Sequence, residues 1–301
     1  MEQRQIGSLS VSLVGLGCNN FGMRVDEAGT VEVVRAALDA GVTLFDTADM
    51  YGGGKSEEFL GKALRDVRDR VVIATKFGAA DGGSPEVVRR SCEESLRRLG
   101  VDVIDLYQQH RPDDDVPIEE TLGALDELVA AGKVREIGCS NFDGPRVDAA
   151  AAASSAAGFV SIQNQLSLLD RRQEDDLLAS CERHGLAILP YFPLASGMLT
   201  GKYRRGEEPP EGTRLATAAE DRRKRALDER NFDVVERLEA FAADRGHTLV
   251  ELAMSWLACL PHMGSVIAGA TSPEQVRTNA AAVGWRLTAD EMAEVDKLAR
   301  R

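Results

Sequence analysis

The chain has 301 residues, of which 44% are hydrophobic and 28% are charged, and its formal net charge at pH 7 is −13. This composition is ordinary for a globular protein with a sizeable core, and the length suits either two small domains or one α/β barrel with insertions. A surface this acidic repels nucleic-acid phosphates and anionic lipids, so we expect neither nucleic acid nor membrane as a partner.

The N-terminal segment and the cysteines favour a cytoplasmic location. The opening sequence MEQRQIGSLSVSLVGLG lacks the basic start and apolar run of a signal peptide, and no apolar stretch reaches the roughly 18 residues of a membrane span. The five cysteines are odd in number and widely spread, without a CxxC pair, and the four histidines do not cluster with them. We therefore expect reduced thiols and no metal site.

Short apolar runs alternate with stretches of helical periodicity along the chain. A β-hairpin is predicted at the start, with Gly7-Ser8 as its turn. Eight runs rich in β-branched residues then predict strands over 12–17, 43–48, 71–77, 103–109, 134–140, 160–165, 186–192 and 264–269. Helical periodicity lies between them, over 31–40, 57–66, 85–99, 118–132 and 173–185. Eight strand–helix units predict one (β/α)8 TIM barrel, with residues 1–301 as a single domain.

A long connection separates the seventh predicted strand from the eighth. It spans about seventy residues and contains the charged, proline-containing stretch 202–225 before two predicted helices, 232–244 and 248–259. A loop of this length in a compact domain is typical of a lid or a binding loop. The basic cluster DRRKR (221–225) is flanked by acidic residues, which indicates a solvated helix face rather than a partner site.

Two glycine-rich stretches resemble nucleotide-binding motifs but fail on spacing. Gly15-Leu16-Gly17 follows a predicted strand, yet Asn20 stands where the dinucleotide fingerprint requires its third glycine. In GMLTGK (197–202) only three residues separate the two glycines, and Tyr203 replaces the Ser or Thr of a phosphate loop. The sequence therefore does not support an open-sheet nucleotide fold.

Polar residues stand at the carboxyl ends of three consecutive predicted strands, where the active site of an α/β barrel lies. Asp46 ends the second strand and Tyr51 follows in its loop, Lys76 ends the third, and His110 ends the fourth. An ammonium group lowers the pKa of a nearby phenol and makes it a workable general acid or base. The aspartate would hold the lysine charged, and the imidazole could orient a carbonyl oxygen. This set suits protonation of an oxygen while another group delivers a hydride.

Each of these residues also has a structural interpretation. An Asp–Lys pair at strand ends is often an ion pair of the barrel rim, a single histidine is often a satisfied polar residue, and Tyr51 beside Gly52-Gly53-Gly54 could anchor a loop. Their occurrence on neighbouring strands favours catalysis, but the pattern by itself leaves the reaction class open.

Several blocks of the sequence resemble a known family. FDTADMYGGGKSEEFLGKAL (45–64), VVIATKFG (71–78), DLYQQHRP (105–112) and REIGCSNF (135–142) are similar to the defining blocks of the aldo-keto reductases. The similarity continues through AILPYFPLASGMLTGKY (187–203) and VIAGATSPEQVRTNAAAV (266–283). The resemblance implies a nicotinamide-dependent oxidoreductase acting on a small-molecule aldehyde, ketone or alcohol.

The resemblance also implies roles for individual residues. Asp46, Tyr51, Lys76 and His110 would form a catalytic tetrad, with Tyr51 as proton donor. The residues expected to bind the cofactor are Ser140, Asn141, Gln163, Tyr191, Pro193, Leu194, Ser196, Gly197, Leu199, Gly201, Lys202, Gly269, Thr271, Ser272, Gln275 and Asn279. The substrate pocket is expected to contain Asn19, Asn20, Phe21, Tyr51, Phe77 and His110.

The preference between the two nicotinamide cofactors is predicted from the segment after the eighth strand. A helix starting near Pro273 would offer free amides to a phosphate, and Thr271, Ser272 and Arg277 would add donors. This segment lacks the Arg or Lys that many family members place near Thr271 or Gln275. We therefore predict that NADP(H) is preferred over NAD(H), but modestly.

Two other functions compete with the oxidoreductase. One is a regulatory subunit of the same fold that holds the cofactor as a redox sensor for a membrane partner. The other is an unrelated barrel lyase or isomerase that uses Lys76 as a Schiff-base amine, which requires a neutral lysine. Asp46 next to Lys76 argues against the second alternative.

Overall fold

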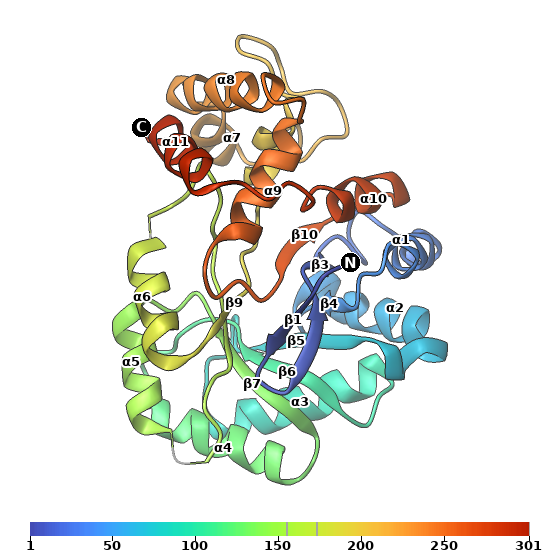
Figure 1. Cartoon of the computed structure of the whole chain (residues 1–301). Helices are drawn as coiled ribbons and strands as arrows, with labels where there is room; N and C mark the ends of the chain where they lie inside the picture. The colour runs from blue at the N-terminus through green and yellow to red at the C-terminus, as the bar shows by residue number, and fades with distance from the viewer. Residues whose placement is uncertain (155, 173, 301) are drawn as a thin grey trace.

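The computed structural model describes residues 1–154, 156–172 and 174–300 (Figure 1). In this part of the chain, eight parallel strands form one sheet in the order β10-β3-β4-β5-β6-β7-β8-β9. They are β3 (Val14–Gly17), β4 (Leu44–Asp46), β5 (Val72–Phe77), β6 (Ile104–Gln109), β7 (Val134–Ser140), β8 (Ser161–Gln163), β9 (Ala187–Ile188) and β10 (Val266–Gly269). Every strand lies within a range predicted from the sequence.

The two edge strands of this sheet meet through isolated bridges rather than a regular ladder. Parallel bridges join Ile188 to Met263 and Tyr191 to Ile267, and the amide of Ile267 donates to the carbonyl of Pro190 over 2.9 Å. The sheet thus curls into a ring, consistent with the predicted (β/α)8 barrel. All eight strands end at the same rim because they run parallel.

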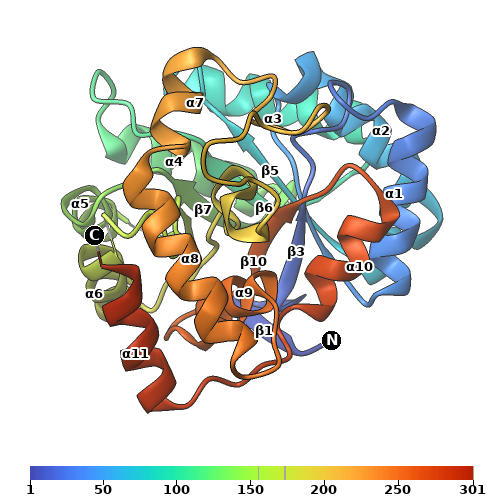
Figure 2. The same cartoon turned by 90° about the horizontal axis from the view of Figure 1, so that it is seen from above.

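Helices surround the sheet in both views (Figures 1 and 2). They are α1 (Glu27–Asp39), α2 (Lys55–Leu64), α3 (Pro85–Leu99), α4 (Ile118–Ala130), α5 (Gly144–Ala153), α6 (Glu174–His184), α9 (Leu249–Cys259) and α10 (Pro273–Ala281). The first residue of the predicted helix 173–185, Gln173, lies outside the described residues. A short 3₁₀ segment, η2 (Arg65–Arg70), follows α2.

Local sequence explains where these helices begin and end. At α3 the Ser84 side chain accepts a hydrogen bond from the Val87 amide, and Pro85 occupies the first turn, where a missing N–H costs nothing. Gly100 ends this helix with a φ of 66°. At α9, Thr248 and Glu251 form a reciprocal capping box.

The predicted hairpin is present and closes one end of the barrel. β1 (Gln3–Ile6) and β2 (Leu9–Ser12) pair antiparallel, with Ile6 opposite Leu9. Gly7 in the turn has a φ of 55°, a conformation that glycine adopts without strain. Ile6 and Leu9 are fully buried against residues that begin strands, among them Leu44 and Val72. The hairpin therefore covers the rim opposite the strand ends and leaves that other rim for a ligand.

The long connection between β9 and β10 contains more structure than its sequence suggested. It forms η3 (Ala195–Thr200), α7 (Glu220–Ala226), α8 (Glu229–Ala243) and α9, and the C-terminal helix α11 (Ala289–Ala299) contacts α8. Within the described chain, residues 201–219 adopt neither helix nor strand, but Tyr203 and Leu215 are buried and the Leu215 amide donates to the Tyr203 hydroxyl over 3.3 Å. Seen from above, the yellow η3 turn lies over the centre of the strand ring (Figure 2).

Among the described residues, no helix combines the length and the apolar character that crossing a membrane requires.

Candidate active site

A cavity of about 580 Å³ opens at the rim where the strands end. Strand-end residues Gly17, Asp46, Gln163 and Gly269 line it, together with side chains from the loops above them. The volume lies within the range of small-molecule sites, and the location is the one that active sites occupy on this architecture.

A buried ion pair lies at the floor of the cavity. Lys76 on β5 donates to Asp46 Oδ2 over 2.7 Å and to the Thr47 carbonyl over 2.8 Å. Both charged side chains are almost completely buried. Burial alone would lower the pKa of Lys76, but Asp46, and then Tyr51, raise it above the ordinary lysine value. Lys76 is therefore firmly protonated.

Asp46 is held from a second side as well. Gln163 at the end of β8 donates its amide to Asp46 Oδ1 over 2.8 Å, and Gln108 on β6 donates to the same oxygen over 3.3 Å. A buried carboxylate with several donors has the hydrogen bonds that its charge requires. Because Gln163 lines the cavity with its nitrogen occupied, its amide oxygen is the atom it can offer to a ligand.

Tyr51 reaches the cavity from a turn that depends on glycine. It begins the 3₁₀ turn η1 (Tyr51–Gly54), in which Gly52 has a φ of 58°. A Cβ at Gly52 would lie 2.7 Å from the Phe21 carbonyl oxygen, so no larger residue fits there. The turn brings the Tyr51 ring to 5.2 Å from Lys76 Nζ.

The pKa of Tyr51 differs from the sequence-based expectation. Burial raises it, Lys76 lowers it and Asp46 raises it again, and the net result lies above the ordinary phenol value of 10.0. Lys76 does act in the predicted direction, but burial outweighs it. At neutral pH the phenol is protonated and is a proton donor.

His110, just after β6, lies beside Tyr51 with the two rings edge to face at 5.9 Å between centroids. Burial, followed by Lys76 and Arg111, lowers the pKa of His110 from 6.5 to about 3. The imidazole is therefore neutral at physiological pH. Its Nδ1 is buried without a hydrogen-bond partner among the described residues. A neutral imidazole facing the cavity can donate one hydrogen bond to a ligand oxygen.

Three of the residues expected to bind the cofactor, Ser140, Asn141 and Tyr191, differ in their access to the cavity. Asn141 and Tyr191 line the cavity, and the Tyr191 hydroxyl donates to Asn141 Oδ1 over 2.7 Å. Asn141 adopts a φ of 62°, and its side-chain nitrogen Nδ2 donates to the His110 carbonyl over 2.9 Å, which ties the two loops together. Ser140 is instead buried, and its hydroxyl donates to the Gln163 carbonyl over 2.7 Å. Ser140 supports this wall without lining the cavity.

The segment after β9 forms one side of the cavity. Pro193, Leu194, Ser196, Gly197 and Lys202 line it, as do Phe192 and Thr200, which the sequence did not single out. Phe192 and Ser196 have φ values of 54° and 59°, which non-glycine residues seldom adopt and which often mark functional sites. Leu199 is fully buried in the core, and neither it nor Gly201 belongs to the lining.

The start of α10 offers fewer free donors than expected. Gly269, Thr271, Gln275 and Asn279 line the cavity, but Ser272 caps the helix by accepting from the Gln275 amide. The amide and the hydroxyl of Thr271 both engage Gln275 Oε1, at 2.9 and 3.2 Å. Pro273 has no N–H. The expectation that this helix start presents free amides to a phosphate is therefore met only in part.

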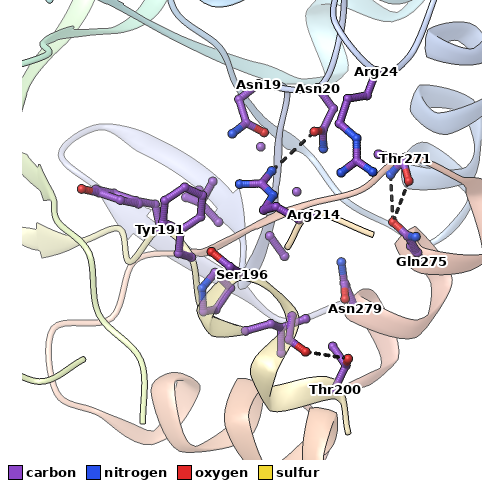
Figure 3. Close-up of a pocket in the computed structure, with 18 of the residues that line it drawn as sticks. Asn19, Asn20, Arg24, Tyr191, Ser196, Thr200, Arg214, Thr271, Gln275 and Asn279 are labelled. Carbon is purple, nitrogen blue, oxygen red and sulfur yellow. Dashed lines mark hydrogen bonds between the residues drawn. The ribbon is translucent and has the colours of Figure 1, made fainter. Parts of the chain in front are cut away.

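Positive charge comes from residues that sequence reasoning missed. Arg24, in the loop between β3 and α1, and Arg214, in the β9–β10 connection, line the cavity; Arg24 lies next to Thr271, and Arg214 donates to Asn20 Oδ1 (Figure 3). In a related correction, Arg222 of the DRRKR cluster donates to Ser196 Oγ over 3.3 Å, so this cluster is not purely a solvated face. No local motif marks these arginines, because they lie about 190 residues apart in the sequence.

The predicted substrate pocket needs one correction. Asn19, Asn20, Tyr51 and His110 line the cavity as expected. Phe21 and Phe77 are fully buried in the core, where Phe77 stacks on Tyr107 at 4.8 Å. Phe77 ends β5 and Phe21 lies in the β3–α1 loop, and such large apolar side chains pack beneath the rim when a core position is open to them. Phe192 is the phenylalanine that lines the cavity.

Among the described residues, no group of three or more His, Cys, Asp or Glu side chains is placed to hold a metal ion.

Comparisons with known proteins agree with this geometry. The family model described as "Aldo/keto reductase family" matches residues 13–300. A probable aldo-keto reductase of Glycine max is 35% identical over 298 residues, which cover 95% of this chain and 84% of that protein. The solved structure of a glycerol dehydrogenase from Gluconobacter oxydans superposes with a TM-score of 0.85 at 31% identity, covering 98% of this chain and 94% of that one. The chain belongs to the aldo/keto reductase family.

Proposed function

We propose that this protein is an NAD(P)H-dependent oxidoreductase that interconverts an aldehyde or ketone with the corresponding alcohol, with Tyr51 as the proton donor. The observation that carries the proposal is a protonated, partly buried Tyr51 next to the Lys76–Asp46 pair and a neutral His110 in one cavity. This arrangement provides a proton and an oriented oxygen, which are what carbonyl reduction requires from the protein.

The cavity suits a nicotinamide dinucleotide along its length. Tyr191 offers an aromatic face near Tyr51, and Asn141 and Gln163 offer amide groups beside it. Beyond them lie the cations Lys202, Arg214 and Arg24, which suit the phosphates of the cofactor. When bound, the reduced nicotinamide supplies the hydride to the carbonyl carbon.

The protein's own residues orient the carbonyl oxygen and supply its proton. His110 donates a hydrogen bond to the carbonyl oxygen and orients it, and Tyr51 transfers its proton to that oxygen as the alcohol forms. Lys76 stabilises the negative charge left on the Tyr51 oxygen, and Asp46 keeps Lys76 protonated and in place. In the oxidative direction the phenolate takes the proton back.

We further propose that NADP(H) is preferred over NAD(H), because the cations at the far end of the cavity favour an additional phosphate. Glu274 also lines this end, so the preference is a balance between opposite charges. We take the chain as one catalytic unit, because the cavity draws residues from Gly17 to Asn279. The five cysteines are free, which supports a reducing compartment such as the cytoplasm.

The two alternative functions receive less support. A redox-sensing regulatory subunit does not need Tyr51, Lys76 and His110 gathered around one cavity. A Schiff-base enzyme needs a neutral lysine, whereas the pKa of Lys76 is raised by its pairing with Asp46.

Titration with NADPH, followed by turnover, distinguishes the three functions. We expect the fluorescence of bound NADPH to change on saturation, and an aromatic aldehyde then to be reduced with one NADPH consumed per alcohol formed. Because one solved relative is named a glycerol dehydrogenase, small polyols are the first alcohols to test in reverse. Binding without turnover of any aldehyde, ketone or polyol would support the sensor. A borohydride-trapped adduct on Lys76 would support the Schiff-base enzyme.

A further inference from the structure

Three arginines from two distant segments gather over the cavity. Arg24 comes from the β3–α1 loop, and Arg214 and Arg222 come from the β9–β10 connection. Their hydrogen bonds go to neutral groups: Arg24 to the Gly212 carbonyl, Arg214 to Asn20 Oδ1 and Arg222 to Ser196 Oγ. Arg214 and Arg222 also lie over the Phe192 ring, at 5.1 and 5.4 Å from its centroid. This is a positive cluster on a chain whose net charge is −13.

The three charges repel one another. The pKa of Arg214 is lowered by burial and then by Arg222 and Arg24. Holding like charges together costs free energy, and an anion between them would recover it. The carboxylates that line the same cavity are Asp46, which is paired with Lys76, and Glu211 and Glu274. A ligand with several negative charges fits this cluster better than a neutral one.

Arg24 is held at one particular end of the cavity. Its backbone amide donates to the Asn20 carbonyl over 2.9 Å, and Asn20 Nδ2 donates to the Ala270 carbonyl over 3.2 Å. These bonds fix the β3–α1 loop against the tail of β10. Figure 3 shows the Arg24 guanidinium next to Thr271 and opposite Gln275, far from Tyr191. Arg214 lies between these two ends (Figure 3).

The start of α10 supplies few donors at that end, and Arg277 on this helix is not among the residues that line the cavity. Ser272 and Gln275 already occupy donors of its first turn, Pro273 lacks an N–H, and Glu274 adds a negative charge. Among the residues that line this end of the cavity, Arg24 is therefore the cation next to Thr271.

We propose that Arg24 is the residue that selects a cofactor with a phosphate on the adenosine 2′-oxygen, while Arg214 contacts the pyrophosphate common to both cofactors. This inference rests on the proposed function, because it takes the nicotinamide to lie at Tyr51 and Tyr191. The adenosine then lies between Thr271 and Asn279, with its ribose next to Arg24. The planar guanidinium can hold a phosphate through two parallel hydrogen bonds, which a ribose hydroxyl cannot match.

Dissociation constants for NADPH and NADH in Arg24→Gln and Arg24→Lys test the inference. We expect Arg24→Gln to raise the dissociation constant for NADPH about 10- to 100-fold and that for NADH less than about threefold, since only the phosphate contact is lost. Arg24→Lys keeps the positive charge but lacks the planar guanidinium. Its affinity for NADPH is expected to lie between those of Arg24→Gln and the wild type. Arg35→Gln is the matched control, because Arg35 is exposed on α1 outside the cavity lining and the substitution removes the same charge.

Competition with 2′-AMP and 5′-AMP separates a phosphate contact from a loop effect. We expect Arg24→Gln to lose affinity for 2′-AMP and to keep that for 5′-AMP. Equal weakening of NADPH and NADH would mean that Arg24 only holds Gly212, and would overturn the inference while leaving the proposed function intact. If Arg24→Gln leaves the ratio of the NADPH and NADH dissociation constants unchanged, the inference is overturned in the same way. A wild-type protein that binds neither dinucleotide would overturn both.

Discussion

Tyr51 is a phenol under opposing electrostatic influences. Burial favours its neutral form, Lys76 favours its anion, and the balance keeps its pKa above that of a free phenol. The proton is therefore present at neutral pH, which suits reduction, whereas oxidation requires the phenolate and should accelerate as pH rises. In the proposed mechanism, Lys76 acts mainly in the transition state, when charge develops on the phenol oxygen.

His110 should not titrate in the physiological range. Because its pKa is lowered to about 3, mainly by burial, we expect its ring NMR signals to stay constant between pH 5 and 8. His110→Gln assigns the signal by its disappearance and is expected to reduce kcat/KM without creating or removing an inflection in this range. A titration of the assigned signal near pH 6.5 would contradict the neutral, orienting role.

Asp49 should make the fold less stable at high pH. One of its oxygens is buried without a hydrogen-bond partner among the described residues, and burial, followed by Glu57, raises its pKa from 3.8 to about 6. For an acid whose pKa is raised by folding, the stabilising contribution is complete below pH 3.8 and is lost as pH rises through 6. Ionised Asp49 therefore costs free energy at pH 8.

Asp49→Asn keeps this position neutral at every pH. We expect it to raise the free energy of unfolding in urea by roughly 1–2 kcal/mol at pH 8 and to have little effect at pH 4. Asp66→Asn is the control, because Asp66 is exposed at the start of η2. If the increase in the free energy of unfolding is larger at pH 4 than at pH 8, the ionisation of Asp49 is not its cause.

At the scale of elements, the alternation of strands and helices could be predicted because it is a local property. Each strand lies within a short, largely apolar run, and the candidate active-site residues Asp46, Lys76 and His110 lie near or just after the ends of such runs. What could not be predicted depends on contacts between distant loops. Arg24 and Arg214 meet only after the β9–β10 connection folds back over the β3–α1 loop, and no spacing rule encodes that contact.

The sequence could not predict how deeply a side chain is buried below the rim either. Phe77 ends β5 and Phe21 follows Asn20, which lines the cavity, but both phenylalanine side chains pack into the core. Helix α10 gives a second example. Its sequence predicts an anion-binding start, but Ser272 and Gln275 turn their polar groups onto the helix itself. Side-chain hydrogen bonds of this kind compete with ligand binding and are decided by local geometry.

The β9–β10 connection is expected to become ordered when cofactor binds. Its long 201–219 stretch is anchored by Tyr203 and Leu215, while its contacts to the opposite loop are single hydrogen bonds from Arg24 and Arg214. We expect rapid amide hydrogen exchange over residues 204–214 without cofactor and slower exchange at saturating NADPH. The buried helix α9 serves as an internal reference, since its exchange should be slow in both states. Strong and equal protection of 204–214 in both states would indicate a rigid excursion instead of a lid.

At the scale of the whole molecule, the apolar residues that stabilise the fold and the polar residues of the candidate site lie in different regions. The hairpin closes the barrel at one rim, large apolar clusters fill the space between sheet and helices, and the other rim is left to polar loops. The overall charge is strongly negative, yet the cavity collects Arg24, Lys202 and Arg214. These three cations lie where an anionic cofactor would bind.

The central claim is that Tyr51 gives up the proton in carbonyl reduction. Its most direct test is the single-turnover rate of NADPH oxidation by an aldehyde in wild type and Tyr51→Phe, measured with the NADPH dissociation constant of each. Because only the phenolic proton is removed, we predict a rate about 10²–10⁴-fold lower with nearly unchanged NADPH affinity. A Tyr51→Phe variant that binds NADPH normally and keeps more than about a tenth of the wild-type rate would contradict the account.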